Sequence, residues 1–190
     1  MEKKEYLVGV TIIEGRNLMG KDAAGTSDPF VKITCANLPP QVTMRKYNAN
    51  TVVWNQSFTF SELFLNQYEL ETFELIIEVY DYNALMTNEL IGFHSIGLST
   101  LYRNLNHEFY KIWVTLFNPE MPNEIQGYLQ VSCFIVGQNE RPPAHAQDQN
   151  VMEDEEEVDE EALAGLSEEQ KIQLMKKKAG IFVLMEPSMA

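Results

Sequence analysis

The stretch Tyr6–Glu14, YLVGVTIIE, has the apolar–polar alternation of a β-strand and ends before a turn at Gly15. Asn55–Ser61, NQSFTFS, alternates in the same way and places Phe58 and Phe60 on one face. Similar runs, bounded by Gly, Asn, Asp and Pro, predict further strands over Pro29–Ala36, Gln41–Tyr47, Glu71–Asp81, Glu89–Leu98, Phe109–Leu116 and Gly127–Gly137. About eight short strands without a long helical period predict an all-β fold, an eight-stranded antiparallel β-sandwich, and disfavour an α/β enzyme fold.

Composition and charge disfavour two classes of protein, those that bind nucleic acids and those that span a membrane. The chain has 190 residues, of which 45% are hydrophobic, and a net charge of −14. This is typical of one globular domain with additional sequence, and it lacks the basic stripe of a nucleic-acid-binding protein. We find neither a signal peptide nor a run of about 20 apolar residues that would span a bilayer, so we expect a cytoplasmic protein. Cys35 and Cys133 lie in apolar runs, which favours buried thiols over a disulfide.

The composition changes after Gly137, and we predict three segments. Residues 1–138 form the sandwich, residues 139–166 an acidic disordered linker, and residues 167–190 a short helix with an apolar C-terminal segment. The linker contains Glu153–Glu161, with eight acidic residues in nine positions, a density that opposes compaction. Ser167 and Gln170 fit a capping box, which predicts a helix over 167–179.

Two loops place carboxylates at strand ends. The first, residues 21–30, contains Asp22 and Asp28, and the second, residues 81–89, contains Asp81 and Glu89 with Asn83 between them. If both loops lie at one end of the sandwich, the carboxylates repel one another and a hard divalent cation relieves the repulsion. Ca²⁺ accepts carboxylate and amide oxygens, so we predict a calcium site at these five residues. The alternative is that Asp and Asn only cap turns here.

These loops resemble those of a C2 domain. The relevant stretches are Leu18–Ile33, LMGKDAAGTSDPFVKI, and Val79–Gly92, VYDYNALMTNELIG, together with Trp54-Asn55 before the next strand. The strand order is similar to the circularly shifted, type II topology, in which Gly127–Ser132 belongs to the last strand. The resemblance covers about residues 5–137, and it implies that Asp22, Asp28, Asp81, Asn83 and Glu89 are calcium ligands. C2 domains that bind several ions usually present five aspartates, so Asn83 and Glu89 depart from the pattern and imply lower affinity.

A narrower resemblance, to the ferlins, lies in Asn106–Gly137. Its Phe-Tyr-Lys-x-Trp stretch, Asn-Pro-Glu and Gly-Tyr-Leu-x-Val are similar to an early ferlin C2 domain, and an acidic linker follows in both. Ferlins are long, tail-anchored proteins with several C2 domains that act in Ca²⁺-dependent membrane fusion and repair. The resemblance therefore implies a membrane-trafficking module that binds phospholipid when Ca²⁺ is present.

The expected membrane contact is Leu85 and Met86, at the tip of the second loop. Lys32, Arg45 and Lys46 form a thin basic patch that is a weaker candidate for binding lipid headgroups. Since the chain is strongly acidic, bound Ca²⁺ would supply the positive charge needed to approach an anionic phospholipid membrane. We thus expect a peripheral membrane protein.

Two other functions are compatible with the sequence. The first is a calcium-independent scaffold, in which Glu153–Glu161 and the 167–179 helix bind a protein partner. The second is an enzyme, but His94, His107 and His145 are far apart in sequence and no nucleophile motif lies near them. We therefore expect no catalytic activity.

Overall fold

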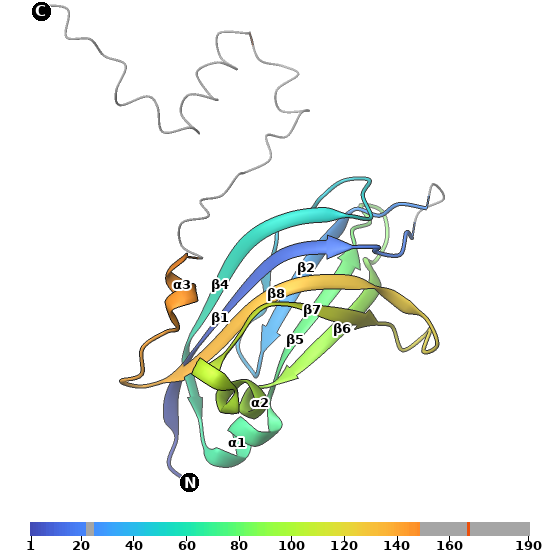
Figure 1. The fold of residues 1–190 in the computed structure, drawn as a ribbon. Helices are drawn as coiled ribbons and strands as arrows, with labels where there is room; N and C mark the ends of the chain where they lie inside the picture. Colours follow the sequence, from blue (N-terminus) through green and yellow to red (C-terminus); the bar gives the residue numbers. More distant parts are fainter. Residues whose placement is uncertain (22–24, 149–166, 168–190) are drawn as a thin grey trace, which may run out of the picture. The chain divides into compact units, whose positions relative to one another are not determined.

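A computed structural model describes residues 1–21, 25–148 and 167. It contains eight antiparallel strands: β1 (Lys4–Arg16), β2 (Pro29–Cys35), β3 (Gln41–Val42), β4 (Val52–Leu65), β5 (Glu74–Asp81), β6 (Glu89–Gly97), β7 (Glu108–Phe117) and β8 (Ile125–Gly137). The helices are short: α1 (Gln67–Thr72), α2 (Leu98–Arg103), the 3₁₀ helix η1 (Leu105–His107) and α3 (Ala144–Asp148). The predicted all-β fold is confirmed (Figure 1).

The strands form two layers that are joined at one corner. The hydrogen-bonded order is β3-β2-β5-β6-β7-β8-β1-β4, and β6 meets β7 through the single pair Phe93 and Phe117. The sheet therefore folds over on itself, with β3-β2-β5-β6 facing β7-β8-β1-β4. As predicted, the last strand contains Gly127–Ser132, and it pairs with both β1 and β7.

The core lies between these layers, and in strands such as β2 every second side chain points into it. Fully buried side chains come from both layers; they include Val8, Val10, Ile12, Val31, Ile33, Leu75, Ile77, Val79, Leu129 and Val131. Strand β4 is the edge strand of its layer. Its register with β1 shifts at two places, and Asn55 and Glu62 adopt positive φ there. Such bulges twist an edge strand and reduce pairing with other chains.

Three predicted strands differ by three or more residues at an end. Strand β4 covers Val52–Leu65 instead of Asn55–Ser61. Strand β5 begins at Glu74 instead of Glu71 because the capping box of Asn66 and Glu69 starts α1 just before it. Strand β3 ends at Val42 instead of Tyr47, since the following residues bond irregularly to β2, with Lys46 N donating to Pro29 O.

The chain continues to contact the sandwich after β8. In α3, the His145 ring stacks on Tyr110 at 3.8 Å between centroids, and its Nδ1 lies 3.0 Å from Glu108 Oε1. The residues of α3 fall in the predicted 139–166 linker. The remainder of that linker, including Glu153–Glu161, and the predicted 167–179 helix apart from Ser167 lie outside the described residues.

Candidate functional site

Three connections meet at the end of the sandwich that lies away from α1 and α2 (Figure 1). They follow β1, β3 and β5, and backbone hydrogen bonds tie them together. Ala49 N donates to Ser27 O at 2.9 Å, which joins the first two connections, and Tyr82 N donates to Asp28 O at 3.0 Å, which joins the first and third. The two acidic loops of the sequence analysis are therefore neighbours in space.

Three of the predicted carboxylate ligands line one cleft of about 350 Å³ at this end: Asp28, Asp81 and Glu89. Asp81 ends β5 and pairs with Glu89 at the start of β6. Asp81 Oδ1 accepts a hydrogen bond from Asp28 N at 2.7 Å, and Asp28 Oδ1 accepts one from Asn48 N at 2.8 Å. These backbone bonds fix the orientation of both carboxylates at the cleft.

Asn83 also lines the cleft, but its amide oxygen is engaged within its own loop. This Oδ1 accepts hydrogen bonds from Leu85 N at 3.1 Å and Met86 N at 3.2 Å. The loop is thereby turned so that Leu85 is 94% exposed and Met86 is 74% exposed. The structure places the two predicted membrane contacts as an apolar tip beside the acidic cleft.

Arg45 lines the same cleft, as do Tyr82 and Tyr47, and both rings lie close to its guanidinium. Its guanidinium carbon lies 3.9 Å from the Tyr82 ring centroid and 4.5 Å from that of Tyr47. Arg45 also donates a 2.6 Å hydrogen bond to Tyr47 Oη, and this bond raises the pKa of the guanidinium. Sequence reasoning missed both tyrosines; the only signal was that each lies next to or near a candidate residue in the chain.

The other two members of the predicted basic patch do not line the cleft. Lys32 lies within β2, where it pairs with Val42 and Glu78, and Lys46 is buried. The second cation of the cleft is Lys21, so three carboxylates and two cations line its described part. The basic side chains partly offset the repulsion that a metal ion would otherwise relieve.

The donor set suits Ca²⁺ in chemical type, because all the candidate ligands are hard oxygen donors. Within the described residues, however, no three Asp, Glu, His or Cys side chains converge closely enough to hold a metal ion. Asp22, the fourth carboxylate, lies outside the described residues. The described residues thus offer oxygen donors of the type that Ca²⁺ uses, but they do not by themselves form a metal site.

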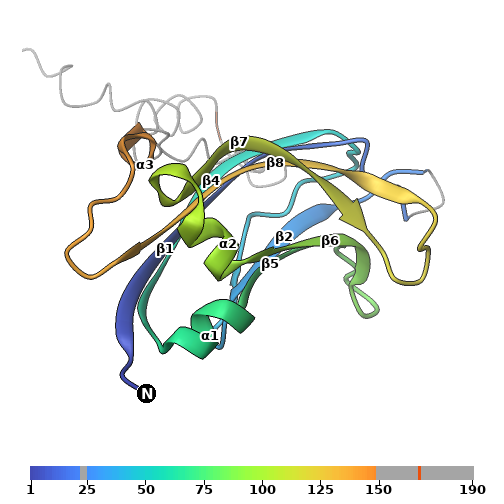
Figure 2. The same ribbon diagram turned by 60° about the horizontal axis from the view of Figure 1, so that its bottom comes forward.

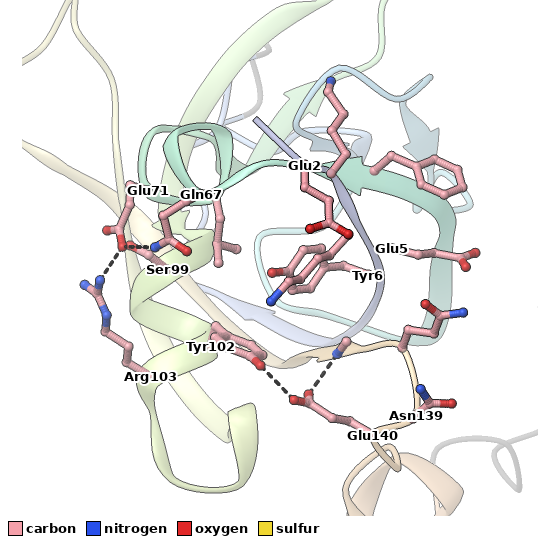
Figure 3. A pocket seen from close by; sticks show the side chains of 16 residues that line it. Glu2, Glu5, Tyr6, Gln67, Glu71, Ser99, Tyr102, Arg103, Asn139 and Glu140 are labelled. Atoms are coloured by element: carbon pink, nitrogen blue, oxygen red, sulfur yellow. Dashed lines mark hydrogen bonds and ion pairs between the residues drawn. The ribbon is translucent and has the colours of Figure 1, made fainter.

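A larger cleft of about 710 Å³ lies at the opposite end, around Tyr6, Ser99 and Tyr102 (Figure 3). Its polar side chains interact with one another. Tyr102 Oη donates to Glu140 at 2.7 Å, and Arg103 forms an ion pair with Glu71. Lys3 forms an ion pair with Glu69, which does not line the cleft. This mutual pairing indicates a structural role for these groups.

No helix of the described chain has the length and apolar character needed to cross a membrane. The C2 domain family matches residues 6–116. Ferlin 2 of Tetrahymena thermophila is 62% identical over 144 residues, which are 76% of this chain and 8% of that protein. Ferlin 2 of Toxoplasma gondii is 29% identical over 82% of this chain and 11% of its own length, and human myoferlin is 26% identical over 77% and 7%. The chain thus spans a small part of these relatives.

The fold is shared with solved C2 domains. A C2 domain of plant extended synaptotagmin 1 superposes with a TM-score of 0.58 at 25% identity, over 70% of this chain and 96% of that domain. A pair of C2 domains from extended synaptotagmin 2 gives 0.55 at 22% identity, over 72% of this chain and 43% of the pair. The match over residues 6–116 and the eight-stranded sandwich together show that this chain belongs to the C2 domain family, and its sequence is similar to that of ferlins.

Proposed function

We propose that this C2 domain binds phospholipid membranes in a Ca²⁺-dependent manner, as a peripheral module on the cytoplasmic side that serves trafficking or fusion. The observation that carries the proposal is the cleft that Asp28, Asp81 and Glu89 line beside an apolar loop tip. A C2 domain is a non-catalytic module whose general role is membrane binding, and the sequence similarity to ferlins supports this role.

Each residue of the site has a separate task in the proposal. Asp28, Asp81 and Glu89 hold Ca²⁺ together with Asp22, and bound Ca²⁺ supplies the positive charge that attracts lipid phosphate. Asn83 keeps the loop tip turned outward, and it joins the ion only if it releases Leu85 N and Met86 N. Leu85 and Met86 enter the interfacial region of the bilayer.

Arg45 contributes to headgroup binding in this proposal. Its guanidinium lies against two aromatic rings at the cleft, and arginine forms paired hydrogen bonds to phosphate oxygens. Lys32 and Lys46, the other residues of the predicted patch, lie outside the cleft, so we assign them at most a supporting charge.

The first experiment is calorimetric titration of Ca²⁺ into the full chain. We expect saturable binding, which Asp81→Asn weakens about tenfold or more because it removes a charged ligand. The matched control is Glu74→Gln, which changes an exposed carboxylate at the far end of the same strand and should bind like the unmodified chain. Absence of a binding heat at millimolar Ca²⁺, with anionic vesicles also present, would contradict the calcium site.

Vesicle sedimentation then tests the membrane contact. Leu85→Ser should reduce Ca²⁺-dependent sedimentation with phosphatidylserine-containing vesicles, because it removes apolar surface from the loop tip. Leu105→Ser is the control, since Leu105 is also highly exposed but lies in η1. Equal losses in both variants would argue against a specific role for the tip.

The second candidate is a calcium-independent scaffold for protein assembly. Two cations, Lys21 and Arg45, already offset part of the carboxylate charge in the cleft, and this favours a site that is stable without metal. In that case the protein-binding parts would be Glu153–Glu161 and the 167–179 helix. Full binding to a partner in the presence of a Ca²⁺ chelator would favour this candidate.

A further inference from the structure

Four large apolar side chains are exposed on the outer face of the β7–β8 hairpin. Trp113 is 42% exposed, Phe117 48%, Ile125 51% and Tyr128 37%. We call these four residues the hairpin patch. Single exposed apolar residues are common, but a contiguous group of this size usually marks an interaction surface.

The strand register makes the hairpin patch contiguous. Phe117 pairs directly with Ile125, and Tyr128 lies opposite Thr115, one row away from Trp113 and its partner Gln130. The intervening residues Val114, Leu116 and Leu129 are buried in the core. Because side chains alternate across a strand, the four apolar side chains occupy neighbouring rows of the same outer face.

Two of the charges beside the hairpin patch compensate each other, those of Arg16 and Glu14. Arg16 of β1 lies opposite Tyr128, and its guanidinium carbon is 4.8 Å from the Trp113 ring centroid. Glu14 forms an ion pair with Arg16 at 2.6 Å, so its negative charge is balanced where it lies near the hairpin patch. The remaining acidic groups, Glu120 and Glu124, lie in the turn that joins the strands. The hairpin patch is therefore an uncharged aromatic surface with one arginine against it.

The hairpin patch extends to the end of the sandwich that carries the acidic cleft. Met19 N, in the connection after β1, donates to Gln126 O at 2.9 Å, and Asn118 Nδ2 donates to Leu90 O, near the start of β6, at 3.0 Å. Figure 2 shows the β7–β8 turn on the same side of the molecule as the loop between β5 and β6. The turn of the hairpin thus lies at the same end of the sandwich as the loop that carries Leu85 and Met86.

We propose that the hairpin patch is a second bilayer contact, which lies in the interfacial region when the loop tip is docked. This inference rests on the proposed function. Tryptophan and tyrosine favour the membrane–water interface, and Arg16 can direct its charge to the headgroups while its aliphatic part remains on Trp113. The domain then lies tilted on its β7–β8 side, with Glu120 and Glu124 at headgroup level.

Trp113 provides a direct test, because the chain has two tryptophans and the other, Trp54, is buried. In a Trp54→Phe variant of the full chain, all tryptophan fluorescence comes from Trp113. With vesicles of equal parts phosphatidylcholine and phosphatidylserine and with Ca²⁺, we expect a blue shift, and we expect brominated phosphatidylcholine to quench the emission. Sedimentation of the same samples measures binding independently.

The outcomes separate the two proposals. If the protein sediments with vesicles but Trp113 is neither shifted nor quenched, the hairpin contact is wrong and the proposed function stands; the hairpin patch would then be available for a protein partner. If the protein fails to sediment and Trp113 is unchanged, both proposals are contradicted.

A second pair of variants remains informative if Trp54→Phe does not fold. Ile125→Ser should lower the vesicle partition coefficient about fivefold, since it removes apolar area from the contact. Phe64→Ser is the matched control, because Phe64 is similarly exposed, at 53%, but lines the cleft at the opposite end. Identical partitioning of the two variants would overturn the proposal.

Discussion

Arg45 has an unusual position for an arginine beside carboxylates. It lines the cleft with Asp28, Asp81 and Glu89, yet the interactions recorded for it among the described residues are with Tyr47 and Tyr82. Aromatic stacking and the bond to a phenol oxygen hold the guanidinium without neutralising it. Its charge therefore opposes a cation in the cleft and favours an anion at its mouth.

This position predicts opposite effects on calcium and on lipid. Arg45→Gln should raise Ca²⁺ affinity about fivefold without lipid, because a like charge is removed from a partly solvated site. The same variant should bind phosphatidylserine vesicles more weakly at saturating Ca²⁺. Calorimetry and sedimentation measure the two effects, and Arg45→Lys, which keeps the charge, is the control. A parallel change in both affinities would show that Arg45 acts only on the fold of the loop.

At the scale of residues, the sequence predicted which carboxylates line the cleft but not what surrounds them. Asp28, Asp81 and Glu89 were identifiable because they lie at strand ends, where strand pairing determines their position. The hydrogen bonds of Asn83 and the burial of Lys46 depend on the path of the loops, which side-chain periodicity does not encode.

Among the elements, the segment after β8 is held to the sandwich by Glu140. Its carboxylate accepts hydrogen bonds from Gly137 N at 2.8 Å and from Tyr102 Oη at 2.7 Å (Figure 3). The bond from Gly137 is the main cause that lowers the pKa of Glu140, and the same carboxylate raises the pKa of Tyr102 to about 12. The largest cause of each shift is a hydrogen bond to the ionised carboxylate of Glu140.

This contact predicts a pH-dependent contribution to stability. Since the pKa of Glu140 is lower in the folded state, its stabilisation is present above the pKa of an unfolded glutamate and is lost as pH falls through the folded value. Glu140→Gln should lower the free energy of unfolding by about 1 kcal/mol or less at neutral pH, because the site is exposed. Below the folded pKa of Glu140 the difference should vanish.

Thermal denaturation of both proteins across this range provides the measurement, with Glu2→Gln as a control on the same cleft. A difference that persists unchanged at acidic pH would mean that Glu140 acts through packing and not through its charge.

The elements also show where sequence patterns are sufficient. All eight strands were predicted from short alternating or apolar runs between turn residues. In β2 the buried and partly exposed residues alternate without exception, whereas β1 and β8 contain five and six consecutive buried residues. Helix α1 was missed although Asn66 and Glu69 form a recognisable capping box, since the apolar run that follows them dominated the interpretation. Helix α3 was beyond prediction because its position depends on the stacking of His145 on Tyr110, a contact between distant parts of the chain.

At the scale of the whole molecule, the accessibility of the two cysteines indicates whether the two layers of the sandwich are packed together. Cys35 of β2 and Cys133 of β8 belong to opposite layers, and both are buried and free. Burial raises the pKa of each thiol to about 12. The reactive form of cysteine is the thiolate, so each thiol is protected both by its protonation and by the layer that covers it.

We therefore predict that a water-soluble thiol reagent labels neither cysteine of the folded protein at mildly alkaline pH, and labels both after denaturation. Labelling over time should follow global unfolding, because Cys35 and Cys133 become accessible only when the two layers separate. Parallel measurement of unfolding by tryptophan fluorescence, through the buried Trp54, provides the comparison. Rapid labelling of Cys35 alone would show that the β3-β2 edge opens independently, and the sandwich would then not unfold as one cooperative unit.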